Sequence, residues 1–277
     1  VIRGTGELFA RTFTLYRLWG GRLASIGLLL SILFALAAFG LSQTSASDLF
    51  TFEQRRFGTL LALPQFFLNE NARWLPLIHV LLFTGMVMAV QSRVQQLTGN
   101  TVKWTILTWL KTAIPLSILC LILAYFKWFT VLPILLYLPF LLLWAMVMDQ
   151  EQIAAPKGFS RTWALLSGQF ARMTGLALAL LLISLLVFVL MDTVVIYFLF
   201  EFIGMNLALE SDAMDRIASI LLTITTYFLI SQLISVQAIG TFLLYFTLLE
   251  IQEAPFLAKQ AQQIGLQKRI RGIAKES

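Results

Sequence analysis

Six apolar runs, separated by more polar connections, recur along the chain and predict membrane-crossing helices. They cover residues 23–42, 75–91, 113–125, 129–148, 173–200 and 217–249. A helix needs about 20 predominantly apolar residues to cross a hydrocarbon core of roughly 30 Å. The runs lack the alternation of barrel strands, and only helices or closed barrels satisfy every backbone polar group in lipid. The pattern therefore predicts an all-α, polytopic membrane protein with a single transmembrane domain over residues 1–277.

Composition agrees with that prediction. Of the 277 residues, 59% are hydrophobic and 12% are charged, whereas a soluble domain carries roughly 25% charged residues. A chain so poor in charge has to hide most of its surface from water. The single cysteine, Cys120, lies in an apolar run; we expect it to behave as a small buried hydrophobe, and it does not indicate a redox compartment.

The distribution of lysine and arginine predicts the orientation. With the N-terminus inside, the inner segments hold fifteen of these residues and the outer segments hold five. Basic residues favour the cytoplasmic side of a membrane. We therefore expect a multi-pass protein of the bacterial inner (plasma) membrane with both termini in the cytoplasm. The net charge of +6 follows from this topology, and we expect no nucleic-acid binding, because the basic residues form no groove interleaved with aromatic residues.

Three of the inner segments have the pattern of amphipathic helices that lie in the membrane surface. Residues 4–19 and 156–170 each place aromatic side chains near one face, with Phe159, Trp163 and Leu166 on that face in the second segment, and residues 103–111 form a shorter instance. We expect interfacial helices here. The alternative is that each segment is the hydrated end of the span that follows it.

Two of these segments also resemble each other. Residues 9–15, Phe-Ala-Arg-Thr-Phe-Thr-Leu, align without a gap with residues 159–165, Phe-Ser-Arg-Thr-Trp-Ala-Leu. Eleven residues after the arginine of each segment comes another arginine, Arg22 or Arg172. The match predicts a repeated unit of surface helix, span and returning span, with 103–111 as a degenerate middle copy. Three such hairpins would form a parallel threefold repeat, unlike the inverted repeats of many transporters.

Short motifs connect this layout to known membrane domains. The chain has Gly-Glu-Leu-Phe at 6–9, the elbow sequence at 158–168, and the tail segments 250–253 and 265–270. With six spans, this layout resembles a family of bacterial membrane proteins. It is similar to the membrane domain found fused to glycerophosphodiester phosphodiesterases and to stand-alone Bacteroidetes-type membrane proteins. The resemblance implies no catalytic residues, and we expect no phosphodiesterase domain within residues 1–277.

Two ionisable residues inside predicted spans are candidates for an intramembrane polar site. His79 lies one turn into the second span and Asp192 lies in the outer part of the fifth. Both fall toward the outer face, so a contact between them is geometrically possible, and such a pair could carry protons or bind a cation. The alternative, which we favour, is that each is satisfied locally by neighbouring polar groups or water.

The sixth span carries further polar residues. Ser231, Gln232 and Ser235 fall near a common face by their spacing. Gln232 and Ser235 are therefore candidates for a polar lining of a substrate path. Hydrogen bonding between helices is the alternative, which contributes roughly 0.6 kcal/mol per pair in membranes, and we favour it.

Five basic residues are candidate contacts for lipid headgroups or a partner: Arg11, Arg161, Lys268, Arg269 and Arg271. The last three belong to the predicted cytoplasmic basic tail, 250–277. A lysine or arginine near an anionic membrane surface contributes about 1 kcal/mol of attraction.

The sequence predicts no enzyme, because one His and one Cys in the whole chain leave no metal motif and no nucleophile–base pair at a recognisable spacing. We expect no catalytic residue, metal or cofactor. The leading hypothesis is a non-enzymatic subunit or scaffold of an inner-membrane complex, with membrane lipids and other membrane subunits as partners. The alternatives are a transporter or channel component and a lipid-handling protein.

Overall fold

The computed structural model describes residues 4–42, 75–97, 109–115, 117–118, 131–198, 220–221, 224–225 and 227–252. All regular secondary structure among these residues is helical, which confirms the all-α prediction for the described part of the chain. The helices are α1 (Thr5–Ser42), α5 (Leu75–Leu97), α7 (Val131–Gln150), α8 (Ala155–Leu166) and α9 (Phe170–Tyr197), followed by the C-terminal helix (Tyr227–Gln252).

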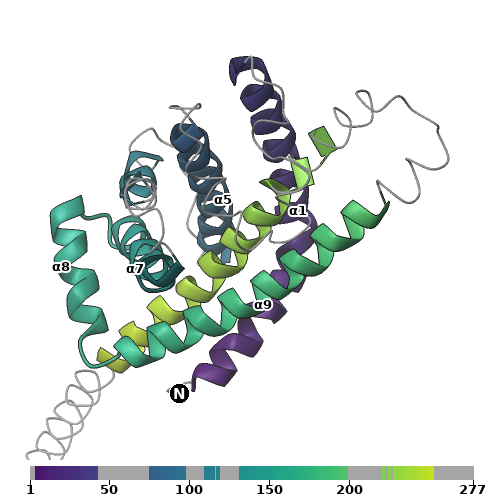
Figure 1. The fold of residues 1–277 in the computed structure, drawn as a ribbon. Coiled ribbons are helices and arrows are strands. Elements are labelled where there is room, and N and C mark those ends of the chain that lie inside the picture. Colours follow the sequence, from purple (N-terminus) through teal and green to yellow (C-terminus); the bar gives the residue numbers. More distant parts are fainter. Residues whose placement is uncertain are drawn as a thin grey trace, which may run out of the picture.

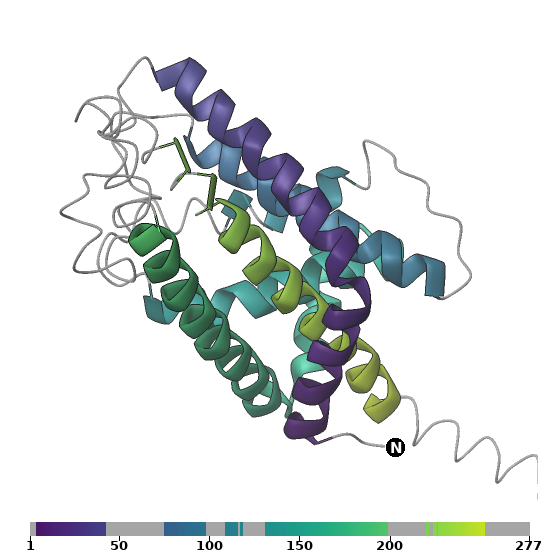
Figure 2. The same cartoon turned by 90° about the vertical axis from the view of Figure 1, so that its right-hand side faces the viewer.

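The C-terminal helix lies at the centre of the bundle. It runs beside α9, and α1 crosses both of them (Figures 1 and 2). Of its most apolar stretch 78% is buried, against 22% for α1. The helix α1 contacts α5 and α9, and α7 contacts α8 and α9. The apolar core therefore forms around the C-terminal helix, while α1 and α9 lie at the periphery.

Several helix ends meet at one end of the bundle, where α1 begins and both α5 and α7 end. Contacts at this end join Gln95 to Asp149, Lys111 to Gln152, Arg161 to Gln252, and Thr5 to the region of Gly175. They bring together the start of α1, the ends of α5 and α7, and the end of the C-terminal helix. We call this end of the bundle the basic end, because most of the described Lys and Arg residues lie near it.

Not all six predicted spans are found. Within the described residues, two helices are long and apolar enough to cross a membrane, Thr5–Ala37 and Tyr227–Gln252, and α8 with α9 would make a third if the bent pair is one span. Among the described side chains, α7 contributes the shorter apolar stretch Pro139–Gln150. Much of the predicted span 113–125 lies outside the described residues. The described residues therefore show apolar helices compatible with a membrane protein, two or three of them of spanning length.

The N-terminal segment differs from the separate surface helix predicted over 4–19. The helix α1 continues through Trp19 into the following apolar run without a break. Its Leu8 and Thr12 are completely buried, and a side chain at Gly240 of the C-terminal helix would contact Thr12. Two consecutive glycines, Gly20 and Gly21, weaken a helix by only about 1 kcal/mol each. Packing of this segment into the bundle outweighs that cost.

The second predicted elbow does form a separate amphipathic helix. A bend of 96° separates α8 from the first half of α9. The bend occurs at Gly168, whose φ of +74° is the left-handed conformation that glycine adopts at the end of a helix. The two arginine-centred segments therefore differ in structure, since only the second is followed by a break. The position of α8 in a membrane surface remains a prediction.

The helix α8 packs on α7 through one face. Its buried residues are Gly158, Thr162, Leu165 and Leu166. The indole Nε1 of Trp144 donates a 3.0 Å hydrogen bond to the carbonyl oxygen of Ala155. Leu166 was expected on the same face as Phe159 and Trp163, but it lies on the buried face, while those two aromatic side chains are exposed. The exposed aromatic face of α8 is thus narrower than predicted.

Close helix contact at Gly27 gives the first prediction. A methyl group there would overlap the hydroxyl of Ser231, whereas a methyl group at Gly20 would meet nothing within 4 Å. We expect Gly27→Ala to lower the unfolding temperature, with a cost of about 1–2 kcal/mol from overpacking. The matched control Gly20→Ala should raise it slightly, because alanine is the better helix former. Thermal unfolding in detergent tests this, and equal effects of the two variants would contradict it.

Candidate functional site

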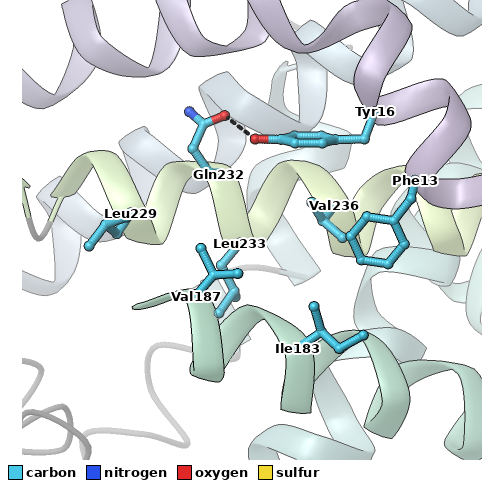
Figure 3. Close-up of a pocket in the computed structure, with 8 residues that line it drawn as sticks. All are labelled: Phe13, Tyr16, Ile183, Val187, Leu229, Gln232, Leu233 and Val236. Carbon is cyan, nitrogen blue, oxygen red and sulfur yellow. Dashed lines mark hydrogen bonds between the residues drawn. The ribbon is translucent and has the colours of Figure 1, made fainter. Parts of the chain in front are cut away.

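A cavity of about 100 Å³ lies between α1, α9 and the C-terminal helix. Figure 3 shows its lining side chains converging from the three helices. The lining residues are Phe13, Tyr16, Ile183, Val187, Leu229, Gln232, Leu233 and Val236. All except Tyr16 and Gln232 are purely apolar. The cavity is thus an apolar space with one polar wall.

Helical spacing explains why these residues face one space. Ile183 and Val187 are four residues apart on α9, and Leu229, Leu233 and Val236 follow at intervals of four and three on the C-terminal helix. Residues at these intervals lie on one face of a helix. On α1, Phe13 and Tyr16 are three residues apart. Each helix therefore contributes one short row of side chains to the cavity.

The polar wall is a hydrogen bond between two distant parts of the chain. The Tyr16 hydroxyl donates to Oε1 of Gln232 at 2.9 Å, as Figure 3 shows. The Nε2 of Gln232 donates in turn to the Ser231 hydroxyl at 3.0 Å. Hydrogen bonding between helices is therefore confirmed for Gln232, which also lines the cavity. Ser235 donates within its own helix, to the carbonyl of Ser231 at 2.9 Å, and is fully buried.

A second polar cluster surrounds Asp149 at the basic end. This carboxylate is 2% exposed and accepts hydrogen bonds from Gln95 Nε2 at 3.1 Å and from Gln150 Nε2 at 3.0 Å. Nearby, the Thr112 hydroxyl donates to Gln91 Oε1 at 3.3 Å. Asp149 is not among the site residues predicted from the sequence. The sequence feature that could have indicated it is the polar run Asp-Gln-Glu-Gln at 149–152, which directly follows an apolar stretch.

Burial governs the ionisation of Asp149, which follows the predicted span 129–148. Removal from water disfavours the charged carboxylate and raises its pKa above the ordinary value of an aspartate. Hydrogen bonds from Gln150 and Gln95 and the charge of Lys111 oppose that rise only in part. A carboxyl group of this kind is a candidate for proton exchange, or for a role in joining α5 to α7.

Arg161 has a structural role in α8. Its Nε lies 3.1 Å from both carboxylate oxygens of Glu151, and Tyr245 donates its hydroxyl to Glu151 Oε1 at 3.3 Å. Gln252 Nε2 donates to the carbonyl of Ala164 at 2.9 Å. These contacts connect the elbow helix to α7 and to the C-terminal helix. The Arg161 side chain is 36% exposed beside this ion pair, and its contact with lipid headgroups or a partner remains a prediction.

Of the other predicted site residues, the structure describes only the side chain of Arg11. Arg11 lies on the exposed side of α1 and forms a 2.9 Å ion pair with Glu7, one turn earlier. The side chains of His79 and Asp192 lie outside those the structure describes. The tail residues Lys268, Arg269 and Arg271 also lie outside the described residues. A His79–Asp192 contact and a basic tail surface remain predictions.

Within the described ranges, no group of three or more His, Cys, Asp or Glu residues could hold a metal ion. Searches of protein-family models, of curated proteins and of solved structures find no match to this chain.

The raised pKa of Asp149 predicts a pH dependence of stability. Between about pH 4, the ordinary pKa of aspartate, and its raised folded value, the folded protein binds more protons than the unfolded chain. Stability contributed by this group therefore falls as pH rises through that window and is constant above it. The unfolding temperature of Asp149→Asn relative to the unchanged protein should increase with pH. Glu250→Gln, which removes an exposed carboxylate, is the control. Parallel curves for Asp149→Asn and the unchanged protein would contradict the assignment.

We expect the ion pair between Arg161 and Glu151 to stabilise the elbow helix α8 against local unfolding. Arg161→Ala removes the contacts of α8 with Glu151 and Gln252, and because the pair is partly exposed its contribution is at most about 1 kcal/mol. We expect amide hydrogen exchange in 155–166 to accelerate about two- to fivefold. Lys157→Ala on the same helix is the control, because Lys157 is exposed. The same acceleration in both variants would show that the ion pair does not hold α8.

Proposed function

We propose that this chain is a non-enzymatic integral membrane subunit or scaffold of a bacterial inner-membrane complex, with six spans and cytoplasmic termini. The observation that carries the proposal is the apolar outer surface of α1 and α9. Leucine side chains there are about 60% exposed, for example Leu29, Leu36 and Leu186. A surface of this kind requires a membrane or a protein partner.

The exposed residues form rows along both helices. On α1 they are Leu28, Leu29, Ile32, Leu33 and Leu36, and on α9 they are Leu178, Leu182, Leu186, Leu190 and Val194. Spacings of three and four place each row on one side of its helix. The row on α9 extends over 17 residues and the row on α1 over nine, which correspond to about 24 Å and about 12 Å along the helix axis at 1.5 Å per residue. Helices with such outer faces suit contact with acyl chains or with helices of other membrane subunits.

The basic end of the bundle supports the proposed orientation. Arg93, Lys111, Lys157 and Arg172 lie at or near the helix ends that meet there. Lysine and arginine are enriched on the cytoplasmic side of membrane proteins. We therefore assign the basic end to the cytoplasm. The same assignment places α8 and its exposed aromatic residues at the inner surface, and proposed partners are membrane lipids and other membrane proteins.

The interior polar groups support a structural role more than a catalytic one. Glu151 binds Arg161, Gln232 binds Tyr16, and Asp149 accepts two glutamine amides. All of these bonds except that between Gln150 and Asp149 join separate helices or the α7–α8 corner, and they occupy the polar groups involved. The resemblance to stand-alone bacterial membrane domains points in the same direction.

The cavity favours one alternative function over the other. A transporter or channel for polar solutes needs a polar path, whereas six of the eight lining residues here are apolar. A lipid-handling protein needs an apolar space that opens beside a membrane. If the scaffold proposal fails, lipid handling is therefore the second candidate.

Recovery of partners tests the scaffold proposal. The tagged protein is extracted from its native membrane in mild detergent and analysed by mass spectrometry and native mass. We expect another membrane protein in stoichiometric amount. Recovery of the chain alone, or with lipid only, would contradict the proposal.

Selective labelling tests the orientation. In a Cys120→Ser background, Lys157→Cys places a thiol on the exposed side of α8. Because we assign this end to the cytoplasm, a membrane-impermeant maleimide should label it only after the inner membrane of spheroplasts is opened. A cysteine in a periplasmic protein of the same cells is the control for reagent access. Labelling in intact spheroplasts would reverse the orientation.

A further inference from the structure

We propose that the cavity between α1, α9 and the C-terminal helix binds one acyl chain of a membrane lipid. This inference rests on the proposed membrane location, but not on the scaffold role. The cavity would hold the end of the chain between the helices, with the lipid headgroup remaining at the membrane surface.

The cavity is continuous with the lipid-facing side of α9. Val187 lines the cavity and is also 48% exposed. Its neighbours Leu186 and Leu190 belong to the outer apolar row of the same helix. In Figure 3, Val187 and Ile183 project from α9 toward the C-terminal helix. An acyl chain lying along these described side chains of α9 would reach the cavity past apolar groups.

The position along the helix also suits an acyl chain. Ile183 and Val187 lie 13 to 17 residues after Phe170, which corresponds to about 20–25 Å along the axis. The hydrocarbon core of a bilayer is about 30 Å thick. With the start of α9 at the inner surface, the cavity lies in the hydrocarbon region, beyond the reach of headgroups of the inner leaflet.

The chemistry of the walls selects an apolar occupant. Apolar cavities of comparable size stay free of water and bind small apolar molecules such as benzene. The polar wall does not recruit a charged group, because the Tyr16 hydroxyl and the Gln232 carbonyl oxygen bind each other. A volume of about 100 Å³ accommodates a short run of methylene groups and not an entire lipid. The occupant is therefore the tail of a lipid.

Photo-crosslinking tests this inference. The purified full chain is placed in nanodiscs of phosphatidylethanolamine and phosphatidylglycerol that contain a phosphatidylcholine with a diazirine in its acyl chain. We expect cross-links at the cavity residues Ile183, Leu233 and Val236. Val187→Phe should reduce these cross-links about tenfold by filling the mouth of the cavity. Val194→Phe makes the same change on the outer face of α9, away from the cavity lining, and should leave them unchanged.

A second cavity-filling variant, on the C-terminal helix, distinguishes a filled cavity from a local distortion of α9. Leu233→Phe should also reduce cross-linking at Ile183, and unfolding temperatures identify variants that fail to fold. The inference is overturned if cavity cross-links are absent from the unchanged protein, or if they persist equally in the folded Val187→Phe and Leu233→Phe variants.

Failure of this site is distinguishable from failure of the wider proposal. Cross-links at Leu190 and Val194 report contact of α9 with lipid whether or not the cavity is filled. Their presence without cavity cross-links rejects only the acyl-chain site. The partner experiment, done on native membranes, tests the scaffold role independently.

Discussion

Close packing of the C-terminal helix against α1 and α9 is the constraint on which the rest of the structure depends. Glycines permit this packing. A side chain at Gly27 of α1 would overlap Ser231, and one at Gly240 would overlap Leu180 of α9. Because hydrophobic burial does not drive association between helices inside a bilayer, small residues that let backbones approach are a common source of stability there. The central helix thereby places the cavity, its polar wall and the contacts with the elbow.

The C-terminal helix also provides hydrogen-bond partners for polar groups on the other helices. Near its start, Gln232 binds Tyr16, and near its end Tyr245 and Gln252 bind the α7–α8 corner. A polar group buried without a partner is costly in an apolar medium, so these bonds favour one arrangement of helices over others. The apolar outer rows of α1 and α9 need no hydrogen-bond partners. They therefore suit contact with lipid or with other subunits.

Local hydrophobic patterns predicted the helices well where the burial of side chains follows the pattern of the neighbouring sequence. The helix predicted at 173–200 is found as α9 at Phe170–Tyr197, and the elbow predicted at 156–170 is found as α8 at Ala155–Leu166. The break expected after residue 19 does not occur, because Leu8 and Thr12 are held by helices that are distant in sequence. Gln232 was recognised from its spacing in an apolar helix. Its partner Tyr16 is 216 residues away, and no local pattern indicates such a pair. Asp149 was missed because its burial depends on α5.

We infer that α1 and α9 face lipid around a buried C-terminal helix. Spin labels in nanodiscs test it most directly, using single cysteines introduced by Leu33→Cys, Leu186→Cys and Ile239→Cys in a Cys120→Ser background. The account predicts that oxygen, which dissolves in lipid, relaxes labels at 33 and 186 strongly and the label at 239 weakly. A water-soluble nickel complex should reach none of them. Strong relaxation by the nickel complex at 186 would contradict the account, because it would place the outer face of α9 in water.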